Sequence, residues 1–411
     1  MTTALPPRSL NPFRTLARYR NFRLFWFGQT FSLIGSWMQT VAVGWTALVL
    51  SNDALIVGLV SAAGTFPILV LSLPGGVVAD RNQKLRVVFI AQILMLAEAA
   101  ALWGLSLTGH LTIHWLLTLS LFGGTLAAFE IPARQSLMVE LVGKEDLPQA
   151  IGLNSMGFNL ARVLGPSIAA IVIARLGVSW TFGLNALSYL AVVVGLLMIR
   201  LPERRAVLRS TAGSVTGAFE AIRHVRDSPE LPILLAIATV FSVLGVPVIT
   251  LLPVIARDLL GLGADGYGAL MATLGLGAVV GALGIAATGG GVDRGKVLRL
   301  ASFAFAGLLL LFSFVRTPIL AGLLLVGIGG AMIVNNALIN AKLQELVPDD
   351  LRGRVLSIYV MVYVGGAPIG SVLAGWIARS FGVQYALGAG AAVMLLFAFW
   401  AFRRHPLLTA R

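Results

Sequence analysis

Polar side chains recur at helical spacing inside an apolar segment near the start of the chain. They are separated by three, four and three residues, which places them on one face of a helix: Gln29, Ser32, Ser36 and Gln39. Hydrogen bonds to their own backbone or across a helix contact would explain the two serines. Long amides in an apolar setting are better explained by a polar cavity. We therefore predict that this face lines a substrate pathway.

A second polar face contains a cation. Ser155, Asn159 and Arg162 follow each other at separations of four and three residues, and Gly165 and Pro166 come next. Arg162 lies about twelve residues into its apolar segment, or about 18 Å at the rise of an α-helix. An arginine near the centre of a bilayer costs about 2.5 to 3.5 kcal/mol on insertion scales. We therefore expect Arg162 to face an anion and Asn159 to line the cavity.

Two acids within apolar segments are candidate partners for that cation and candidate proton carriers. They are Glu98, near the middle of its segment, and Glu130, towards the end of the next. One hypothesis is that Glu130 and Arg162 form a partly buried pair whose protonation changes during transport. The alternative is that Glu130 pairs with Arg134 one helical turn away. Unchanged pH-dependent transport in Glu130→Gln would contradict the proton role.

Neutral amides gather at the end of a later apolar segment. Asn336, Asn340 and Gln344 recur every four residues, next to Asn335. Asn336 and Asn340 are predicted to line the cavity. A gate of interhelical hydrogen bonds is an equally acceptable explanation.

The sequence offers no catalytic or metal-binding constellation. His110 and His114 are four residues apart but lack a third ligand, and no Ser-His-Asp set is found. The stretch from Gly290 to Lys296 resembles a nucleotide-binding loop, yet Val297 stands where a magnesium-binding hydroxyl is needed. We therefore expect neither an enzyme nor a cofactor.

These side chains belong to a chain of 411 residues, of which 58% are hydrophobic and 11% are charged. Such a composition excludes an ordinary soluble domain. A helix that spans a bilayer needs roughly 20 apolar residues. Runs of this kind begin near Leu24, Ala54, Val87, Thr112, Ile151, Trp180, Leu231, Tyr267, Leu300, Ile319, Val355 and Tyr385. We predict an all-α membrane protein with twelve transmembrane helices.

Basic residues fix the expected orientation. With the N-terminus inside, 25 of the 30 Lys and Arg residues fall in the tails and the inner links. This bias predicts that both termini are cytoplasmic. The net charge of +13 is thus a topology signal, and we expect the lipid bilayer and a small molecule as partners, not nucleic acid.

Repeated segments divide the chain into two halves. Residues 31–35, 140–142 and 173–175 reappear as 241–245, 345–347 and 377–379, with separations of 210, 205 and 204 residues. Two pseudo-symmetric six-helix bundles are therefore expected. The predicted segments are a cytoplasmic tail (1–23), a first bundle (24–200), a cytoplasmic loop (201–230), a second bundle (231–402) and a tail (403–411). Within the loop, residues 217–226 suit either a short surface helix or a solvated tether, and we favour the tether.

The link between the second and third apolar runs has a distinctive spacing. Its glycine, acidic and basic residues are Gly76, Asp80, Arg81, Lys84 and Arg86. This pattern resembles the signature loop of the major facilitator superfamily, with Gln83 and Leu85 as departures. Arg352 and Arg354, in a basic triplet before the eleventh run, also resemble that superfamily.

A glycine series in the fifth run resembles the exporter motif of the same superfamily. Gly152, Gly165 and Pro166 match it, whereas Ala161, Ala169 and Ala170 replace glycines. Pro368 in the eleventh run marks a second predicted bend. Together with residues 21–24, 37–45 and 132–135, these features resemble the twelve-helix bacterial exporter branch, which includes enterobactin exporters, transmembrane secretion effectors and multidrug efflux proteins.

The resemblance implies alternating access between two bundles of a monomeric proton antiporter in a bacterial inner membrane. It implies that the first, fourth, seventh and tenth spans line the cavity, which favours Glu130 over Glu98 as the functional acid. Asp80 would contact the amino end of the eleventh span and help to hold the bundles together on the cytoplasmic side. The expected activity is proton-driven export of a small amphipathic or aromatic drug, siderophore or metabolite. The alternatives are an importer or lysophospholipid flippase on the same fold, or a membrane receptor or scaffold without transport.

Overall fold

A computed structural model describes residues 13–143, 145–200, 215–287 and 293–405, and within these ranges every regular element is a helix. Parts of the predicted tails and of the loop between the bundles lie outside the described residues, namely 1–12, 201–214 and 406–411. The start of the stretch that resembles a nucleotide-binding loop also lies outside them.

The first bundle follows a short helix, α1 (Phe13–Arg18). Its helices are α2 (Arg20–Ser51), α3 (Ala54–Arg81), α4 (Lys84–Leu107), α5 (Ile113–Val142), α6 (Leu147–Leu176) and α7 (Ser179–Leu197). The turns between them follow from local chemistry. Asn52 has a left-handed φ of 51°, and Asp53 then accepts a hydrogen bond from the Leu55 backbone N–H, so only two residues separate α2 from α3.

The second bundle begins after the connecting helix α8 (Val215–Asp227). Its helices are α9 (Leu231–Gly245), α10 (Pro247–Val254), a π-helical turn (Ile255–Leu259), α11 (Ala264–Ala287), α12 (Arg294–Ser313), α13 (Pro318–Leu346), α14 (Asp349–Phe381) and α15 (Val383–Arg404). Pro247 lacks a backbone N–H, which explains the break between α9 and α10. Residues 231–259 nevertheless form one apolar span.

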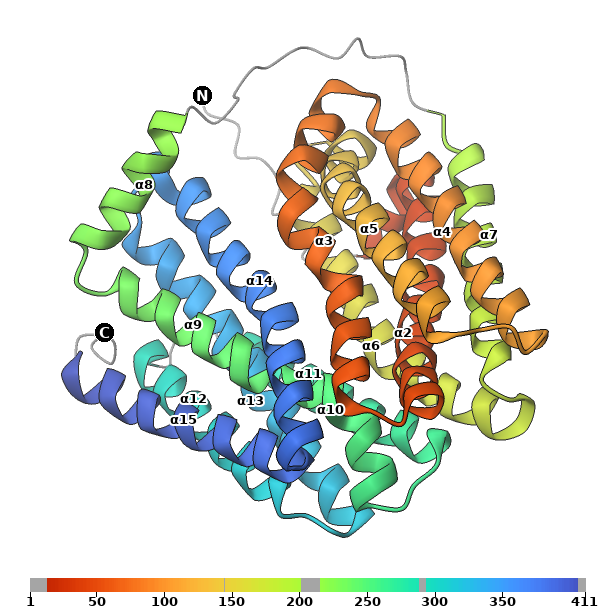
Figure 1. Cartoon of the computed structure of the whole chain (residues 1–411). Coiled ribbons are helices and arrows are strands. Elements are labelled where there is room, and N and C mark those ends of the chain that lie inside the picture. The colour runs from red at the N-terminus through yellow and green to blue at the C-terminus, as the bar shows by residue number, and fades with distance from the viewer. Residues whose placement is uncertain (1–12, 144, 201–214, 288–292, 406–411) are drawn as a thin grey trace, which may run out of the picture.

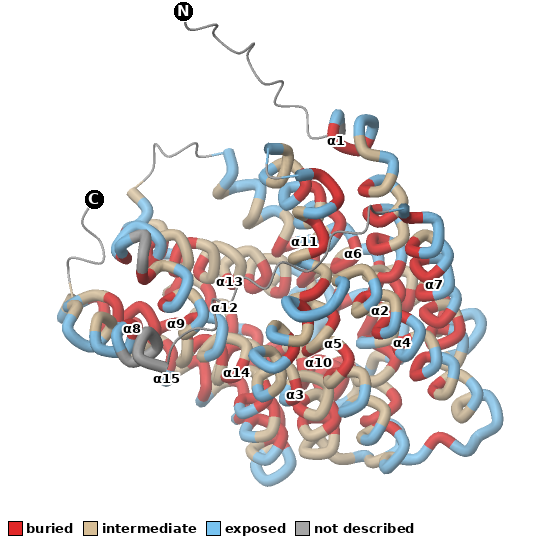
Figure 2. The backbone as a smooth tube through the Cα atoms, turned by 90° about the horizontal axis from the view of Figure 1, so that it is seen from above, coloured by how far each residue is buried: buried red, intermediate tan, exposed pale blue. Residues whose placement is uncertain are grey.

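Twelve helices of the described chain are long and apolar enough to cross a membrane, which confirms the predicted fold class. Between 33% and 61% of each apolar window is buried, so much of every helix remains available to lipid. Figure 2 shows buried and exposed positions side by side along the same helices. Several helices extend beyond the predicted apolar runs into charged residues, because helical hydrogen bonding continues past the hydrocarbon core to the membrane surface.

The two bundles contact each other mainly through α3 with α14 and α6 with α11. Glycines permit this approach: a Cβ atom on Gly275 would lie 2.6 Å from the Arg162 carbonyl oxygen, and one on Gly375 would lie 2.8 Å from that of Ala54. We call the end where α2 finishes the distal end, and the end where α2 begins the terminal end. Figure 1 shows the bundles, coloured red to yellow-green and green to blue, meeting towards the distal end and splaying apart at the other.

Helix α8, which precedes the second bundle, packs against α9 and α14 of that bundle. Ala221 is fully buried, and the Arg354 guanidinium lies 3.1 Å from the Glu220 carboxylate. The structure therefore has the surface helix in place of the solvated tether that we favoured. Ile222 remains 55% exposed, as expected of a helix at a membrane surface.

Candidate substrate cavity

A cavity of about 450 Å³ lies mainly within the first bundle. All four polar residues predicted from the first apolar run line it: Gln29, Ser32, Ser36 and Gln39. Helices α3, α4 and α5 supply most of the remaining lining, and the second bundle adds Ile249, Thr250 and Tyr267. Its size is within the range of small-molecule sites.

Glu98 is the acceptor at the end of a partly buried hydrogen-bond chain in this cavity. The Gln39 amide donates to both Glu98 carboxylate oxygens, at 3.1 and 3.2 Å. The Asn185 amide donates to the Gln39 carbonyl oxygen at 2.7 Å, which fixes the orientation of Gln39. Glu98 is 4% exposed and forms no ion pair with any described residue. Glu130 of the fourth span also lines the cavity, so the third span contributes to it as well as the fourth, although the resemblance implied a lining from the first, fourth, seventh and tenth spans.

The serines of α2 serve partly as local supports. The Ser36 hydroxyl donates to the Ser32 carbonyl oxygen at 2.9 Å and lies 3.1 Å from the Tyr189 hydroxyl. Tyr189 belongs to α7 and also lines the cavity. This arrangement joins α2 to α7 beside Glu98.

Glu130 is paired, but with a different cation from the one that we proposed. The Arg134 Nε atom lies 2.9 Å from a Glu130 carboxylate oxygen, and the Gln92 amide donates to the same oxygen at 3.3 Å. The predicted Glu130–Arg162 pair is therefore wrong in this structure, and the alternative pair with Arg134 is correct. Residues four apart on a helix lie next to each other, whereas Arg162 is on another helix.

Arg162 occupies the interface between the bundles. Its guanidinium lies over the Trp37 ring, 5.8 Å from the ring centroid, and its backbone packs against Gly275 of α11. The side chain is 8% exposed, so it does not face lipid. A cation–π contact replaces the anion that we expected.

Two amides of the cavity have unused acceptor atoms. The Oε1 atoms of Gln29 and Gln92 are buried and have no hydrogen-bond partner. Gln29 is 5% exposed and Gln92 is 1% exposed, and both line the cavity. Because buried polar atoms are nearly always partnered, these two oxygens are candidate contacts for a ligand.

Three predicted cavity residues do not line this cavity: Asn159, Asn336 and Asn340. The Asn159 amide donates to the Ser155 carbonyl oxygen on its own helix at 2.8 Å. Asn340 accepts a hydrogen bond from Gln344, also on its own helix. Asn336 and Asn340 lie on α13, a helix of the second bundle, which supplies little of the lining.

The signature loop makes fewer contacts than expected. Asp80 and Arg81 are exposed, and neither forms a described hydrogen bond or ion pair through its side chain. Asp80 therefore does not contact the amino end of α14, because the bundles are apart at the terminal end. Lys84 instead pairs with Glu140 at 2.9 Å, and the corresponding residues of the second bundle, Arg294 and Glu345, also form an ion pair.

The predicted glycine and proline positions differ in role. Gly165 is tightly packed, since a Cβ atom there would lie 2.9 Å from the Ile34 carbonyl oxygen, whereas Gly76 and Gly152 have open space. Pro166 and Pro368 lie inside α6 and α14 without ending either helix. Of the other basic residues, Arg352 donates to the Gln344 carbonyl oxygen at 3.2 Å, whereas Arg86 is exposed.

Sequence reasoning missed Asn185, Tyr189 and Gln92. The signal for the two amides was available, because each is a long polar side chain inside an apolar run, as Gln29 and Gln39 are. Tyr189 carried no such signal, since an aromatic residue in a membrane helix usually packs against neighbouring helices.

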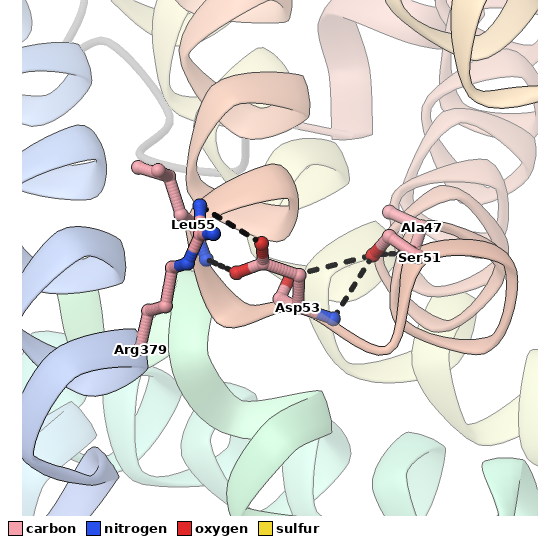
Figure 3. Close-up of polar contacts among 5 residues, drawn as sticks. All are labelled: Ala47, Ser51, Asp53, Leu55 and Arg379. Atoms are coloured by element: carbon pink, nitrogen blue, oxygen red, sulfur yellow. Dashed lines mark hydrogen bonds and ion pairs between the residues drawn. The ribbon is translucent and has the colours of Figure 1, made fainter.

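An ion pair that the sequence did not suggest joins the bundles at the distal end. Asp53 lies 3.3 Å from the Arg379 guanidinium of α14 (Figure 3). Asp53 also caps α3, and its backbone N–H donates to the Ser51 hydroxyl at 3.2 Å. Nearby, Thr250 of α10 lies 3.2 Å from Ser61 and 2.9 Å from Ser371, hydroxyl to hydroxyl. These contacts close the distal end.

Comparison with known proteins identifies relatives along nearly the whole chain. The model of the family described as transmembrane secretion effector matches residues 9–409. The staphyloferrin A transporter of Staphylococcus aureus is 26% identical, over 87% of this chain and 90% of the relative. The multidrug efflux pump Tap of Mycolicibacterium fortuitum is 29% identical, over 88% of this chain and 90% of the relative. The enterobactin exporter EntS of Shigella flexneri is 27% identical, over 86% of this chain and 84% of the relative.

Solved structures share the fold at low identity. A bacterial homologue of the human lysosomal transporter Spinster, in an inward-facing and unoccupied conformation, superposes with a TM-score of 0.74 and 15% identity, covering 95% of this chain and 98% of that one. The nucleoside transporter NupG gives a TM-score of 0.68 and 16% identity, covering 98% and 99%.

Proposed function

The chain belongs to the transmembrane secretion effector family of the major facilitator superfamily, and from that premise we propose that it exports a small amphipathic or aromatic compound in exchange for protons. It is a multi-pass inner-membrane transport protein and not an enzyme. The direction, the driving ion and the class of compound are our proposal.

The export direction follows relatives named as an efflux pump and an enterobactin exporter, and the conformation is one that an exporter adopts when it takes up substrate. If the basic links face the cytoplasm, as the positive-inside bias predicts, the closed distal end faces outwards. The bundles then splay towards the cytoplasm, which is the side from which an exporter takes up its substrate. Rocking of the bundles about the cavity would expose it to the other side.

Buried Glu98 is the observation that carries the proton-coupling proposal. It lies in the cavity, its described hydrogen-bond partner is a neutral amide, and no described cation pairs with it. An ionisable residue within a membrane is a functional-site candidate, and one without a fixed counter-ion can be neutralised by a proton or by a ligand. Exchange requires that proton and substrate weaken each other's binding, and this coupling acts in both directions.

Everted membrane vesicles provide the test. We expect a fluorescent aromatic dye, tried in a cationic and a neutral form, to accumulate when a proton gradient is imposed and to leave when an ionophore collapses it. Glu98→Gln should remove the response to the gradient while leaving downhill movement of the neutral dye. Glu145→Gln, an exposed acid outside the cavity, is the matched control and should behave as wild type.

Absence of movement of both dyes at two external pH values would contradict transport of this class of compound. A normal gradient response in Glu98→Gln would contradict the assignment of the proton to Glu98. In that case Glu130→Gln, which removes the other acid of the cavity, becomes the decisive variant.

A further inference from the structure

We propose that the cavity selects a protonated amine attached to an aromatic or otherwise apolar body. This inference rests on the proposed transport function and specifies its substrate class. It follows from three properties of the cavity: its charge, its unused hydrogen-bonding atoms and its walls.

The charges of the lining favour a cation. Among the described residues that line the cavity, the acids are Glu98 and Glu130, and Arg134 is the single lysine or arginine. Arg134 already pairs with Glu130 on the same helix. Glu98 therefore remains without a counter-charge, and an anionic ligand would find no free cation in the lining. Desolvating an unpaired charge is costly, so the cavity discriminates against anions.

The buried atoms of the lining that have neither a hydrogen bond nor an ion pair are acceptors, since Arg134 Nε, which makes no hydrogen bond, is ion-paired with Glu130. The Gln29 and Gln92 carbonyl oxygens are buried without a partner. In contrast, the Gln39 amide nitrogen is taken by Glu98, and its oxygen is taken by Asn185. Two buried amide oxygens thus lie in the same cavity as the Glu98 carboxylate, and all three groups accept hydrogen bonds. A protonated amine supplies N–H donors to such groups, whereas a quaternary ammonium supplies none.

The walls suit an apolar body next to the charge. Aromatic and aliphatic residues of both bundles complete the lining: Val57, Val60, Met95, Phe158, Tyr189, Ile249 and Tyr267. The Tyr267 ring is fully buried and stacks on Trp45, with centroids 6.3 Å apart and an interplanar angle of 20°. A rigid aromatic wall of this kind favours flat ligands and attracts a nearby cation.

A set of naphthalene derivatives tests the proposal by direct binding to the purified full-length protein in nanodiscs. The compounds share the naphthalene ring and differ in the polar head group. They are 2-(1-naphthyl)ethylamine, its N,N,N-trimethylammonium derivative, 2-(1-naphthyl)ethanol and the carboxylate 1-naphthaleneacetate. We expect the protonated amine to bind about tenfold to a hundredfold more tightly than the alcohol, as a charge-assisted hydrogen bond implies. The quaternary compound should bind more weakly than the amine, and the carboxylate should not bind.

Variants assign the selectivity to the named atoms. Glu98→Gln should lose at least about tenfold in affinity for the amine and leave the alcohol within about twofold, whereas Glu98→Asp should retain the preference. Gln29→Leu should reduce the difference in affinity between the amine and the quaternary compound. Glu145→Gln is the control for removal of an acid, and size-exclusion chromatography establishes that each variant is folded.

Equal binding of the amine and the alcohol, binding of the carboxylate as tight as that of the amine, or a quaternary compound that matches the amine would each overturn the proposal. These outcomes are separate from those of the transport assay. Selective, Glu98-dependent binding without movement in vesicles would support this inference and contradict the proposed function. Transport that depends neither on the head group of the compound nor on Glu98 would support the proposed function and overturn this inference.

Discussion

Asn185 determines how the Gln39 amide is oriented, and through it how Glu98 is held. Because the Asn185 amide occupies the Gln39 oxygen, the Gln39 nitrogen is directed at the carboxylate. Asn185 is itself fully buried on α7, and Ser188 donates to its side-chain oxygen at 3.1 Å. Asn185 is thus a positioning residue for the acid of the cavity.

We predict that Asn185→Leu lowers the free energy of unfolding by about 0.5 to 1.5 kcal/mol, because it removes the hydrogen bond from Asn185 to the partly buried Gln39 oxygen. The double variant Gln39→Leu/Asn185→Leu should lose less than the sum of the two single variants. Thermal unfolding in nanodiscs measures this double-mutant cycle. Strictly additive losses would show that the two amides do not interact.

The residues around Glu98 also show where sequence spacing stops being informative. Spacing along one helix predicted that the four polar residues of α2 share a face, and it allowed the pair of Glu130 with Arg134, since both are local relations. It did not reveal that Glu98 faces Gln39, because the rotation of α4 relative to α2 depends on packing between helices. The same limit applies to Arg162, whose partner Trp37 lies on another span.

At the scale of elements, close helix contacts set the spacing between the bundles. Gly275 of α11 packs against the backbone of α6, where a Cβ atom would lie 2.6 Å from the Arg162 carbonyl oxygen. Gly284 of the same helix has open space. The two positions therefore form a matched pair for testing the contact.

We predict that Gly275→Val disfavours the conformation that is closed at the distal end, whereas Gly284→Val does not. Overpacking costs about 1 to 3 kcal/mol, which corresponds to roughly a fivefold to 150-fold change in the conformational equilibrium. Spin labels on Asn82→Cys and Ser357→Cys would report the separation of α3 and α14 at the terminal end, and the absence of native cysteine keeps the labelling specific. An unchanged distance distribution in Gly275→Val would contradict the prediction.

The helices themselves were largely predictable, because twelve long apolar runs leave little choice in a bilayer. The positions at which the helices end or break were less predictable. The seventh span divides at Pro247 and ends in a π-helical turn, and α8 becomes ordered by docking Glu220 on Arg354 of α14. Both features depend on contacts made after the helices assemble, which composition does not report.

At the scale of the whole molecule, the distal closure joins the bundles through a pair of opposite charges. Asp53 of the first bundle and Arg379 of the second lie 3.3 Å apart, with side-chain exposures of 20% and 58%. Such partly exposed pairs contribute about 0 to 1 kcal/mol. The pair is thus a small bias on the equilibrium between the two conformations, and not a lock.

We predict that Asp53→Asn and Arg379→Gln each increase opening of the distal end by at most about fivefold, and that the double variant does no more than either. Asparagine retains the ability to cap α3, so this change removes the charge and keeps the helix start. Labelling of Ser61→Cys by a membrane-impermeant maleimide from outside measures the opening. Additive effects in the double variant would show that the two residues act independently.

The sequence repeats predicted two bundles, but not the conformation in which they are found. The contact expected for Asp80 requires α3 and α14 to meet at the terminal end, and here they meet at the distal end. A single sequence is compatible with both arrangements, because a transporter must adopt both.

The two bundles contribute unequally to the lining of the cavity. Polar lining comes mostly from α2, α4 and α5, so a bound molecule would travel with those helices while the other bundle acts as a cover. Substrate specificity would then be determined by the first bundle. A chimaera that combines residues 1–200 of this chain with the remainder of a relative should recognise what this chain recognises.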